Sequence, residues 1–180
     1  MNGVRALWDG IPLNTQLCFS NPEVRDLVLG DIVAFARAHP EVDIIHFWLG
    51  DGWNNHCECA DCRRATPSDW YVRMLNELDE RLTAAGLPTR IVFLLYFDLL
   101  WPPVVERLHN PGRFLLMFAP ITRTYSAAYA VTAGADPGAL PPFAYNRLTF
   151  PRSVDENVAF LRAWQALFRG DSFDYDYHLM

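Results

Sequence analysis

The sequence predicts an α/β fold, and more specifically a partial or truncated (β/α) TIM-type barrel of five to six β/α units with mostly parallel strands. Helix and strand signals alternate along the chain, as they do in α/β folds. The middle strand signals are nearly continuous apolar runs, which is typical of strands covered on both faces. A complete eight-unit barrel takes about 250 residues, so a chain of this length corresponds to five or six units.

The strand signals are short apolar segments between turn residues. We expect strands at residues 16–19, 42–49, 90–96, 114–119 and 172–179. An open nucleotide-binding sheet is the alternative, but no glycine-rich phosphate loop follows any of these segments. No closing helix follows the last expected strand. We therefore interpret residues 1–180 as a single α/β domain that is a fragment of a larger barrel.

The helix signals come with capping residues. A first helix is expected after Asn21-Pro22 and ends at His39-Pro40. A second follows Thr66 and ends at Gly86, and a third begins with the capping box at residues 153–156. Residues 103–109 leave room for one short helix.

Composition restricts the classes of partner. Lys and Arg number 15 against 21 Asp and Glu, which gives a formal net charge of −6 and argues against nucleic acid. Half of the residues are hydrophobic and 20% are charged, which excludes a solvated disordered chain. The apolar runs are shorter than the ~18 residues of a membrane span, and the first residues do not form a signal peptide. We expect a globular domain without nucleic-acid or membrane partners.

Four cysteines form an uneven set, with three of them inside six residues. They are Cys18, Cys57, Cys59 and Cys62. If residues 16–19 and 42–49 are neighbouring parallel strands, all four thiols converge at one edge of the sheet. They would then provide the four ligands of a structural Zn²⁺. Such an ion would hold the loop at residues 51–64 in place and would not activate water. Two disulfides, or four free thiols that pack as small apolar groups, are the alternatives. A thiol redox function fits less well, because the C-x-x-C spacing follows a loop.

Function in parallel barrels is concentrated at the carboxyl ends of the strands, and polar and aromatic residues follow the expected strands there. They include Asp51, Trp53, Asn54, Asn55, Asp98, Arg123, Tyr125, Asp174, Asp176 and His178. Carboxylates and amides bind sugar hydroxyls, and a tryptophan face stacks on a pyranose ring. The sequence therefore predicts sugar binding at this rim, with Trp53 or Trp101 as the stacking residue.

Several of these residues also have plain structural interpretations. Asp51 precedes Gly52, a common turn pair. Asp174 and Asp176 alternate with aromatic residues, as polar side chains on a half-exposed strand do. His46 is interpreted as a hydrogen-bonded core histidine that faces the barrel interior. Residues 120–151 are too long for an ordinary connector, so they either line a substrate groove or contain a degraded strand.

Five short segments carry a resemblance to a known family. They are Leu17 to Val24, Gly50-Asp51-Gly52, Cys57-Glu58-Cys59-Ala60-Asp61-Cys62-Arg63, Pro67-Ser68-Asp69 and Tyr175-Asp176-Tyr177-His178. They resemble the bacterial domain of unknown function numbered 4838 over residues 14–180. The resemblance implies a barrel related to glycoside hydrolases, often beside polysaccharide-degrading modules, and suggests an exported protein.

The functional prediction is a carbohydrate-active domain that binds or hydrolyses a glycan at the carboxyl rim. The alternative is a non-catalytic sugar-binding or scaffold module with a structural zinc site. Hydrolysis requires a proton donor and a second carboxylate, and both position and analogy with related barrel hydrolases point to Asp51 and Asp176. The predicted substrate-binding residues are Trp53, Asn54, Asn55, Asp98, Arg123, Tyr125 and His178. The expected partners are a carbohydrate ligand and the remainder of a larger parent chain.

Overall fold

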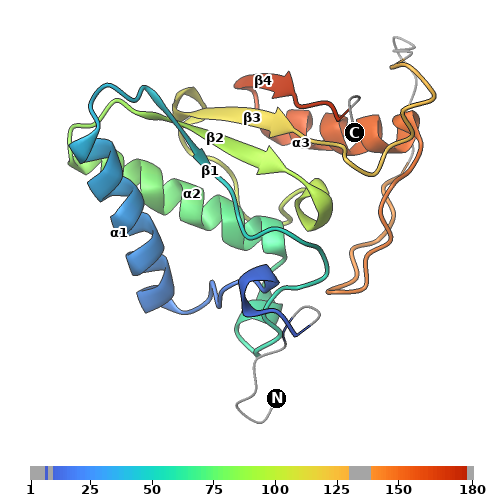
Figure 1. Ribbon diagram of the computed structural model, residues 1–180, viewed down its shortest axis with the longest axis horizontal. Helices are drawn as coiled ribbons and strands as arrows, with labels where there is room; N and C mark the ends of the chain where they lie inside the picture. Colours follow the sequence, from blue (N-terminus) through green and yellow to red (C-terminus); the bar gives the residue numbers. More distant parts are fainter. Residues whose placement is uncertain (1–6, 8–9, 130–138, 178–180) are drawn as a thin grey trace.

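The computed structural model describes residue 7 and residues 10–129 and 139–177, and within them helices alternate with the strands of one parallel sheet (Figure 1). The α/β prediction is confirmed. The strands are β1 Ile44–Phe47, β2 Arg90–Leu95, β3 Phe114–Phe118 and β4 Asp171–Asp174. The α-helices are α1 Pro22–Ala38, α2 Pro67–Ala84 and α3 Val154–Leu167. Short 3₁₀ turns are η1 Pro12–Asn14, η2 Cys62–Arg64, η3 Phe97–Leu100 and η4 Pro111–Arg113.

The strands follow one another across the sheet in chain order, β1-β2-β3-β4, and every neighbouring pair is parallel. In this register Phe47 lies beside Phe93, which lies beside Leu116. Right-handed crossovers in a sheet that grows in one direction place all connecting helices on the same face. This winding differs from that of doubly wound sheets, where the order reverses and helices cover both faces.

The main core lies between the sheet and the helices. Alternate residues of β2 and β3 face α2 and α3, and Phe93 is at the centre of this packing. Its ring centroid lies 5.2 Å from that of Phe168, 5.8 Å from that of Trp164 and 6.3 Å from that of Phe114. These aromatic contacts hold the helical layer on one face of the sheet.

The opposite face of the sheet has a smaller apolar cluster, to which no α-helix of the described residues contributes. A shallow hollow of about 390 Å³ on this face is lined by His46, Trp48, Met117, Phe173 and Tyr175. His46 is exposed and packs edge-on against Trp48, with 5.4 Å between ring centroids, so the prediction of a core histidine is wrong. The expectation of strands covered on both faces holds for β2 and β3, whose residues opposite the helices are buried or partly buried as well, and it is wrong for β1, where Ile44 and His46 are exposed.

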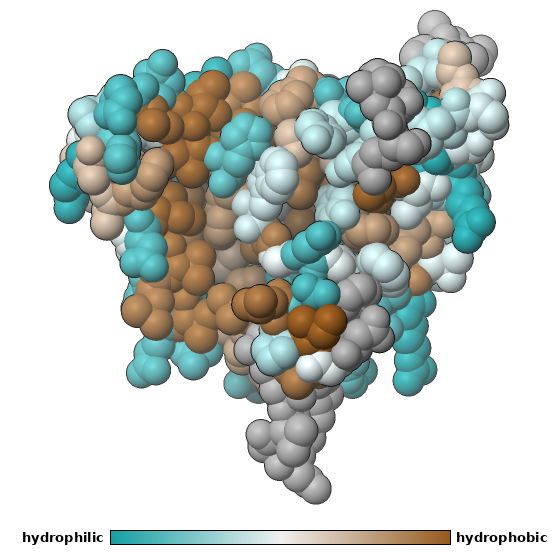
Figure 2. Space-filling view, viewed as in Figure 1, coloured by the Kyte–Doolittle hydropathy of each residue, from teal (hydrophilic) through white to brown (hydrophobic). Residues whose placement is uncertain are grey.

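Apolar side chains also reach the surface at the first helix and strand. Figure 2 shows apolar surface over the region of α1 and β1. Exposed side chains of these elements include Leu27, Phe35 and Ile44. The helical stripe of α1 is therefore only partly buried, with Leu29 and Ala36 as its buried residues.

The capping signals are confirmed where the helices begin. Asn21 caps α1 by accepting a hydrogen bond from the backbone N–H of Glu23 at 2.9 Å. Capping boxes open α2, from Thr66 to Asp69, and α3, from Ser153 to Glu156. These local patterns position the helices because they satisfy N–H groups that have no partner inside the helix.

Two expected elements do not form. Residues 16–19 are irregular: the backbone N–H of Gln16 donates to Asn55 at 3.1 Å, and its side-chain amide exchanges two hydrogen bonds with Gly50. The backbone of this stretch is therefore held by the loop after β1 and does not pair with a strand of the sheet. Residues 103–109 are not helical either, and Asp69 accepts the N–H groups of Val105 and Glu106 there.

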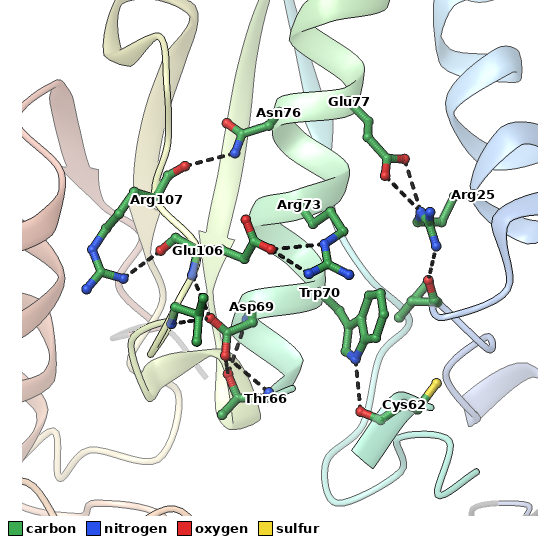
Figure 3. A network of polar contacts seen from close by, with 12 residues as sticks. Arg25, Cys62, Thr66, Asp69, Trp70, Arg73, Asn76, Glu77, Glu106 and Arg107 are labelled. Carbon is green, nitrogen blue, oxygen red and sulfur yellow. Dashed lines mark hydrogen bonds and ion pairs between the residues drawn. The ribbon is translucent and has the colours of Figure 1, made fainter. Parts of the chain in front are cut away.

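Helix α2 holds its neighbours through the polar network shown in Figure 3. Glu77 accepts two hydrogen bonds of 3.0 Å from Arg25 of α1. Arg73 donates to Glu106 at 2.6 Å. The indole N–H of Trp70 donates to the carbonyl oxygen of Cys62 at 2.9 Å. One helix thereby fixes α1, the segment before η4 and the loop that carries the cysteines.

Candidate metal centre and ligand-binding cleft

The four cysteines meet at one point beside the amino-terminal end of α2. Cys18 lies in the turn before α1, Cys57 and Cys59 lie in the irregular loop after β1, and Cys62 begins η2. The four sulfur atoms all lie within 4.8 Å of one another. The predicted convergence is confirmed, although Cys18 comes from a turn and not from the end of a strand.

The sulfur separations match a tetrahedral metal site. Cys18 Sγ lies 3.8 Å from both Cys59 Sγ and Cys62 Sγ. Four sulfurs about 2.3 Å from a central Zn²⁺ are about 3.8 Å apart along the edges of the tetrahedron. All four cysteines are free, since a disulfide would bring two sulfurs to about 2.05 Å, so the disulfide alternative is not formed.

Neighbouring groups hold the cysteine loop in this geometry. The backbone N–H of Cys62 points at Cys59 Sγ at 3.4 Å. The Ser20 hydroxyl lies 3.1 Å from Cys62 Sγ, and the Tyr145 hydroxyl donates to the carbonyl oxygen of Cys57 at 2.7 Å. Such contacts orient ligands around a metal and fix the surrounding loop.

The thiol pKa values show how unequal the four positions are. The backbone N–H of Cys62, followed by the Ser20 hydroxyl, lowers the pKa of Cys59 to about 6. Burial raises the pKa of Cys62 to about 12, and burial also raises that of Cys57. Protonated thiols bind metals poorly, so a bound cation must displace protons from the buried positions, which makes metal affinity dependent on pH.

Asp51 lies in an exposed turn directly after β1. Its carboxylate accepts hydrogen bonds from the backbone N–H of Gly52 at 2.8 Å and from the Tyr96 hydroxyl at 3.2 Å. Gly52 has φ of 100°, which glycine adopts without strain. Asp51 is exposed to solvent, and its assignment as a proton donor stays a prediction.

Asn54 and Asn55 are engaged in holding loops together. The Asn54 side chain accepts from the backbone N–H of Leu148 at 2.8 Å and donates to its carbonyl oxygen at 3.1 Å. Asn55 is buried and donates to the carbonyl oxygens of Asn14 and Asp51. The Asn54 amide ties the loop after β1 to the distant 143–150 segment, and the Asn55 amide ties it to η1. This use differs from the predicted contact with substrate.

Asp98 is the buried carboxyl group at the carboxyl edge of the sheet. Both of its oxygens accept the backbone N–H of Asn54, at 3.0 and 3.1 Å. Phe97 and Asn54 both have positive φ, of 45° and 49°, an unfavourable conformation for a bulky side chain such as phenylalanine. The backbone strain on both sides of this contact keeps Asp98 directed inward.

Burial changes the protonation of Asp98 and of its neighbour. It raises the pKa of Asp98 to about 6 and lowers that of His56 to about 3. His56 Nε2 lies 3.8 Å from Asp98 Oδ1, but a neutral imidazole makes this contact a polar one and not an ion pair. Asp98, His56 and Tyr96 border a small, partly open space of about 20 Å³, which is enough for one water molecule.

The raised pKa predicts a pH dependence that Asp98→Asn removes. An unfolded aspartate titrates near pH 3.8, so the folded protein binds the extra proton between this pH and about 6. This proton should therefore add about 2–3 kcal/mol to the free energy of unfolding at pH 4 and almost nothing at pH 7, and Asp98→Asn should lack this contribution. The lowered pKa of His56 acts in the opposite direction in both proteins, so the prediction concerns the difference between them. Urea unfolding of the two proteins across this range, at equal zinc concentration, measures the difference between their slopes.

The exposed Asp61→Asn serves as the control, because Asp61 contacts only the exposed Arg64. Its stability should follow the wild-type pH profile. Parallel profiles for the wild type and Asp98→Asn would show that the buried carboxyl group does not carry this proton.

Arg123 and Asp176 form an ion pair between the segments that follow β3 and β4. Arg123 Nη2 lies 2.9 and 2.7 Å from the two oxygens of Asp176. The guanidinium carbon lies 4.2 Å from the ring centroid of Tyr125 and 4.6 Å from that of Tyr129. The structure thus brings together Arg123, Tyr125 and Asp176, which were predicted as two substrate-binding residues and the second carboxylate. In the structure they contact one another.

A cleft of about 690 Å³ opens beside this cluster. It is lined by Trp53, Phe97, Thr122, Arg123, Thr124, Leu148, Thr149, Phe150 and Arg152. Trp53 is 41% exposed, and its ring centroid lies 4.9 Å from that of Phe97. The volume falls within the range of small-molecule sites, and an exposed indole at the mouth provides a stacking surface. Neither Asp51 nor Asp176 lines this cleft.

Two outcomes complete the comparison with the sequence prediction. His178 lies outside the described residues. Sequence reasoning missed Phe97, Arg152 and Asn146, whose amide donates to His56 and to Glu58 at 2.8 Å each. Only the polar character of the long loop could have suggested Asn146, and no sequence signal marks the positive φ of Phe97.

Sequence comparison now places the chain among known families. The family model described as "Domain of unknown function (DUF4838)" matches residues 2–133, which is most of the chain. The chain belongs to the DUF4838 family. The match to DUF4838 includes the four cysteines but ends before Asp176, so it begins and ends earlier than the predicted range 14–180. No curated protein and no solved structure matches.

Among the described residues, no helix has the length and apolar character that crossing a bilayer requires.

Proposed function

We propose that this DUF4838 domain binds a glycan in the cleft at the carboxyl edge of its sheet. The observation that carries the proposal is the exposed Trp53 at a cleft of about 690 Å³ that is also lined by three threonine residues. Sugars bind through apolar ring faces that stack on aromatic side chains and through hydroxyls that exchange hydrogen bonds. The cleft offers groups for both kinds of contact.

The second part of the proposal is that Zn²⁺ occupies the site formed by the four cysteines. Four soft thiolates select zinc over magnesium or calcium, which prefer oxygen ligands. With all four positions supplied by protein, the metal has a structural role. It fixes the loop between β1 and α2, and this loop also carries Trp53.

The sheet is proposed to be part of a TIM-type barrel. Support comes from the strand order, which grows in one direction, and from the helical layer on a single face. On this proposal the face of the sheet opposite the helices, which carries His46 and Met117, is the barrel interior. The remainder of a parent chain closes the barrel around it.

Hydrolysis by Asp51 and Asp176 is the catalytic form of the proposal. A non-catalytic sugar-binding module is the second candidate, and two observations favour it. Asp176 is held by Arg123 on both oxygens, and Asp51 lies in an exposed turn outside the cleft. If the pair is catalytic, Asp51→Asn and Asp176→Asn should each reduce the release of reducing ends well beyond threefold, about 0.65 kcal/mol on the barrier.

The binding proposal is tested by replacing the stacking surface. Trp53→Ala should weaken binding to soluble polysaccharides about tenfold, or about 1.4 kcal/mol, because the ring face loses its contact. Isothermal titration calorimetry over a panel of neutral and acidic polysaccharides gives the affinities. Trp48→Ala is the matched control. Trp48 is similarly exposed, at 46%, but it lies outside the cleft, on the face of the sheet opposite the helices.

Two results would contradict the binding proposal. One is the absence of binding by the wild-type domain to every polysaccharide of the panel. The other is an equal loss of affinity in Trp53→Ala and Trp48→Ala, which would show that the cleft is not the site.

A further inference from the structure

The charge of the cleft differs from the charge of the chain. The sequence has a formal net charge of −6, but the residues that line the cleft include Arg123 and Arg152 and no aspartate or glutamate. Neutral sugars are commonly held by carboxylates that accept hydrogen bonds from hydroxyls. A lining with guanidinium groups and without carboxylates favours a ligand that brings its own negative charge.

Arg123 does not supply an available charge. It is only 8% exposed, Asp176 accepts hydrogen bonds from it at 2.7 and 2.9 Å, and its guanidinium lies against two tyrosine rings. Its carboxylate partner offsets its charge. Arg123 therefore forms a rigid part of the cleft wall.

Arg152 is different in its surroundings. Its side chain is exposed, and within the described part of the chain no carboxylate oxygen lies within 4.0 Å of its guanidinium. Its backbone is fixed on both sides: its carbonyl oxygen accepts the N–H of Thr124 at 2.6 Å, and its own N–H donates to Glu156 at 3.0 Å. Arg152 thus lines the same cleft as Trp53, with an exposed side chain on an anchored backbone.

We propose that the cleft selects sugars that carry an anionic substituent, with the ring stacked on Trp53 and the anion bound by Arg152. This inference rests on the proposed glycan binding and names its ligand class. A guanidinium fork matches the paired oxygens of a carboxylate or of a sulfate ester. The ligand class is therefore a uronate-containing or sulfated oligosaccharide, and the two sources share the same recognition chemistry.

The test compares matched sugars on the same protein. Isothermal titration calorimetry would use trisaccharides of galacturonate, of galactose and of galactose sulfate, with glucuronate and glucose oligomers as a second series. The wild-type chain should bind at least one acidic member about tenfold more tightly than its neutral match at 50 mM NaCl. Higher salt should reduce this preference because it screens the charge pair. Whichever of the galacturonate and galactose sulfate trisaccharides binds more tightly shows whether the cleft prefers a carboxylate or a sulfate group.

Arg152→Gln should lose the acidic preference and keep the affinity for the neutral sugar within twofold. Arg147→Gln is the matched control, because it removes the same charge from an exposed position that does not line the cleft. It should retain the preference. Both side chains are exposed, so neither substitution disturbs the core.

The outcomes separate the inference from the proposal beneath it. Equal affinity of the wild type for neutral and acidic members overturns the selection for charge and leaves glycan binding in place. Equal losses in Arg152→Gln and Arg147→Gln also overturn it, because they show a general effect of net charge. Binding of neither class overturns both the proposed function and the inference.

Discussion

Removal of zinc from the purified domain is expected to lower its melting temperature by more than about 10 °C. A structural zinc contributes several kcal/mol to the free energy of unfolding. In a domain of this size, a loss of about 1 kcal/mol lowers the melting temperature by about 2–4 °C. Cys59→Ser should have the same effect. Cys59 Sγ lies 3.8 Å from Cys18 Sγ and accepts the N–H of Cys62, so its loss opens the centre of the site. The loop at residues 51–64 should then exchange its amide hydrogens faster.

The measurements are metal content by mass spectrometry, which should give one zinc per chain, and thermal unfolding with and without a chelator. Ser20→Ala is the control: its hydroxyl lies 3.1 Å from Cys62 Sγ, but it is not one of the four thiol ligands. This variant should retain zinc and most of the stability. Unchanged zinc content in Cys59→Ser, or a melting temperature insensitive to the chelator, would contradict the zinc site.

The local signals in the sequence explain why most elements could be predicted. Capping at Asn21, Thr66 and Ser153 depends on contacts within three residues, and the structure contains each of these caps. The apolar runs of β2 and β3 are equally local, because burial of a strand follows from its own residues. Cys57, Cys59 and Cys62 are close in sequence, so their cluster was visible without any knowledge of the fold.

The cleft could not be predicted in the same way, because it depends on contacts between distant segments. Asn54 pairs with Leu148, 94 positions along the chain, and no local pattern indicates that pairing. The strand expected at residues 16–19 failed for a related reason. Its apolar character was real, but Gln16 binds Gly50 across the loop and leaves no ladder to form.

The inward position of Asp98 shows the same limit in one residue. Sequence reasoning placed it at the carboxyl rim, which is where it lies, but its burial follows from the positive φ of Phe97 and of Asn54. Tertiary packing maintains these backbone conformations against their local preference. A carboxyl group with a raised pKa is thus a property of the fold and not of the residues beside it.

Asp69→Ala is expected to lower the free energy of unfolding by about 3–5 kcal/mol, because it removes a buried carboxylate that accepts four hydrogen bonds, each worth about 1 kcal/mol. Asp69 is 2% exposed and lies at the centre of the network in Figure 3. One oxygen accepts the backbone N–H groups of Val105 and Glu106 at 2.8 and 3.0 Å. The other accepts the hydroxyl and the N–H of Thr66, at 2.7 and 3.2 Å, in the capping box of α2.

The pKa of Asp69 gives this prediction a pH dependence. Burial raises the pKa of Asp69, but the hydrogen bonds from Glu106, Thr66 and Val105 together lower it by more than burial raises it. The pKa of Asp69 therefore lies below the ordinary value of 3.8. The carboxylate therefore contributes stability above about pH 4, and this contribution is lost as pH falls through the lower folded pKa. Asp69→Ala should unfold with a weaker dependence on acid than the wild type.

Glu156→Ala is the matched control, because Glu156 occupies the same third position in the capping box of α3. It accepts the N–H of Ser153 at 3.0 Å, but it is exposed to solvent, so water replaces the lost acceptor. Its loss should cost about 1 kcal/mol. Urea unfolding of both variants at pH 7 measures the two costs. If Asp69→Ala costs no more than Glu156→Ala, the buried carboxylate contributes nothing beyond a helix cap, and the 104–107 segment is held by other contacts.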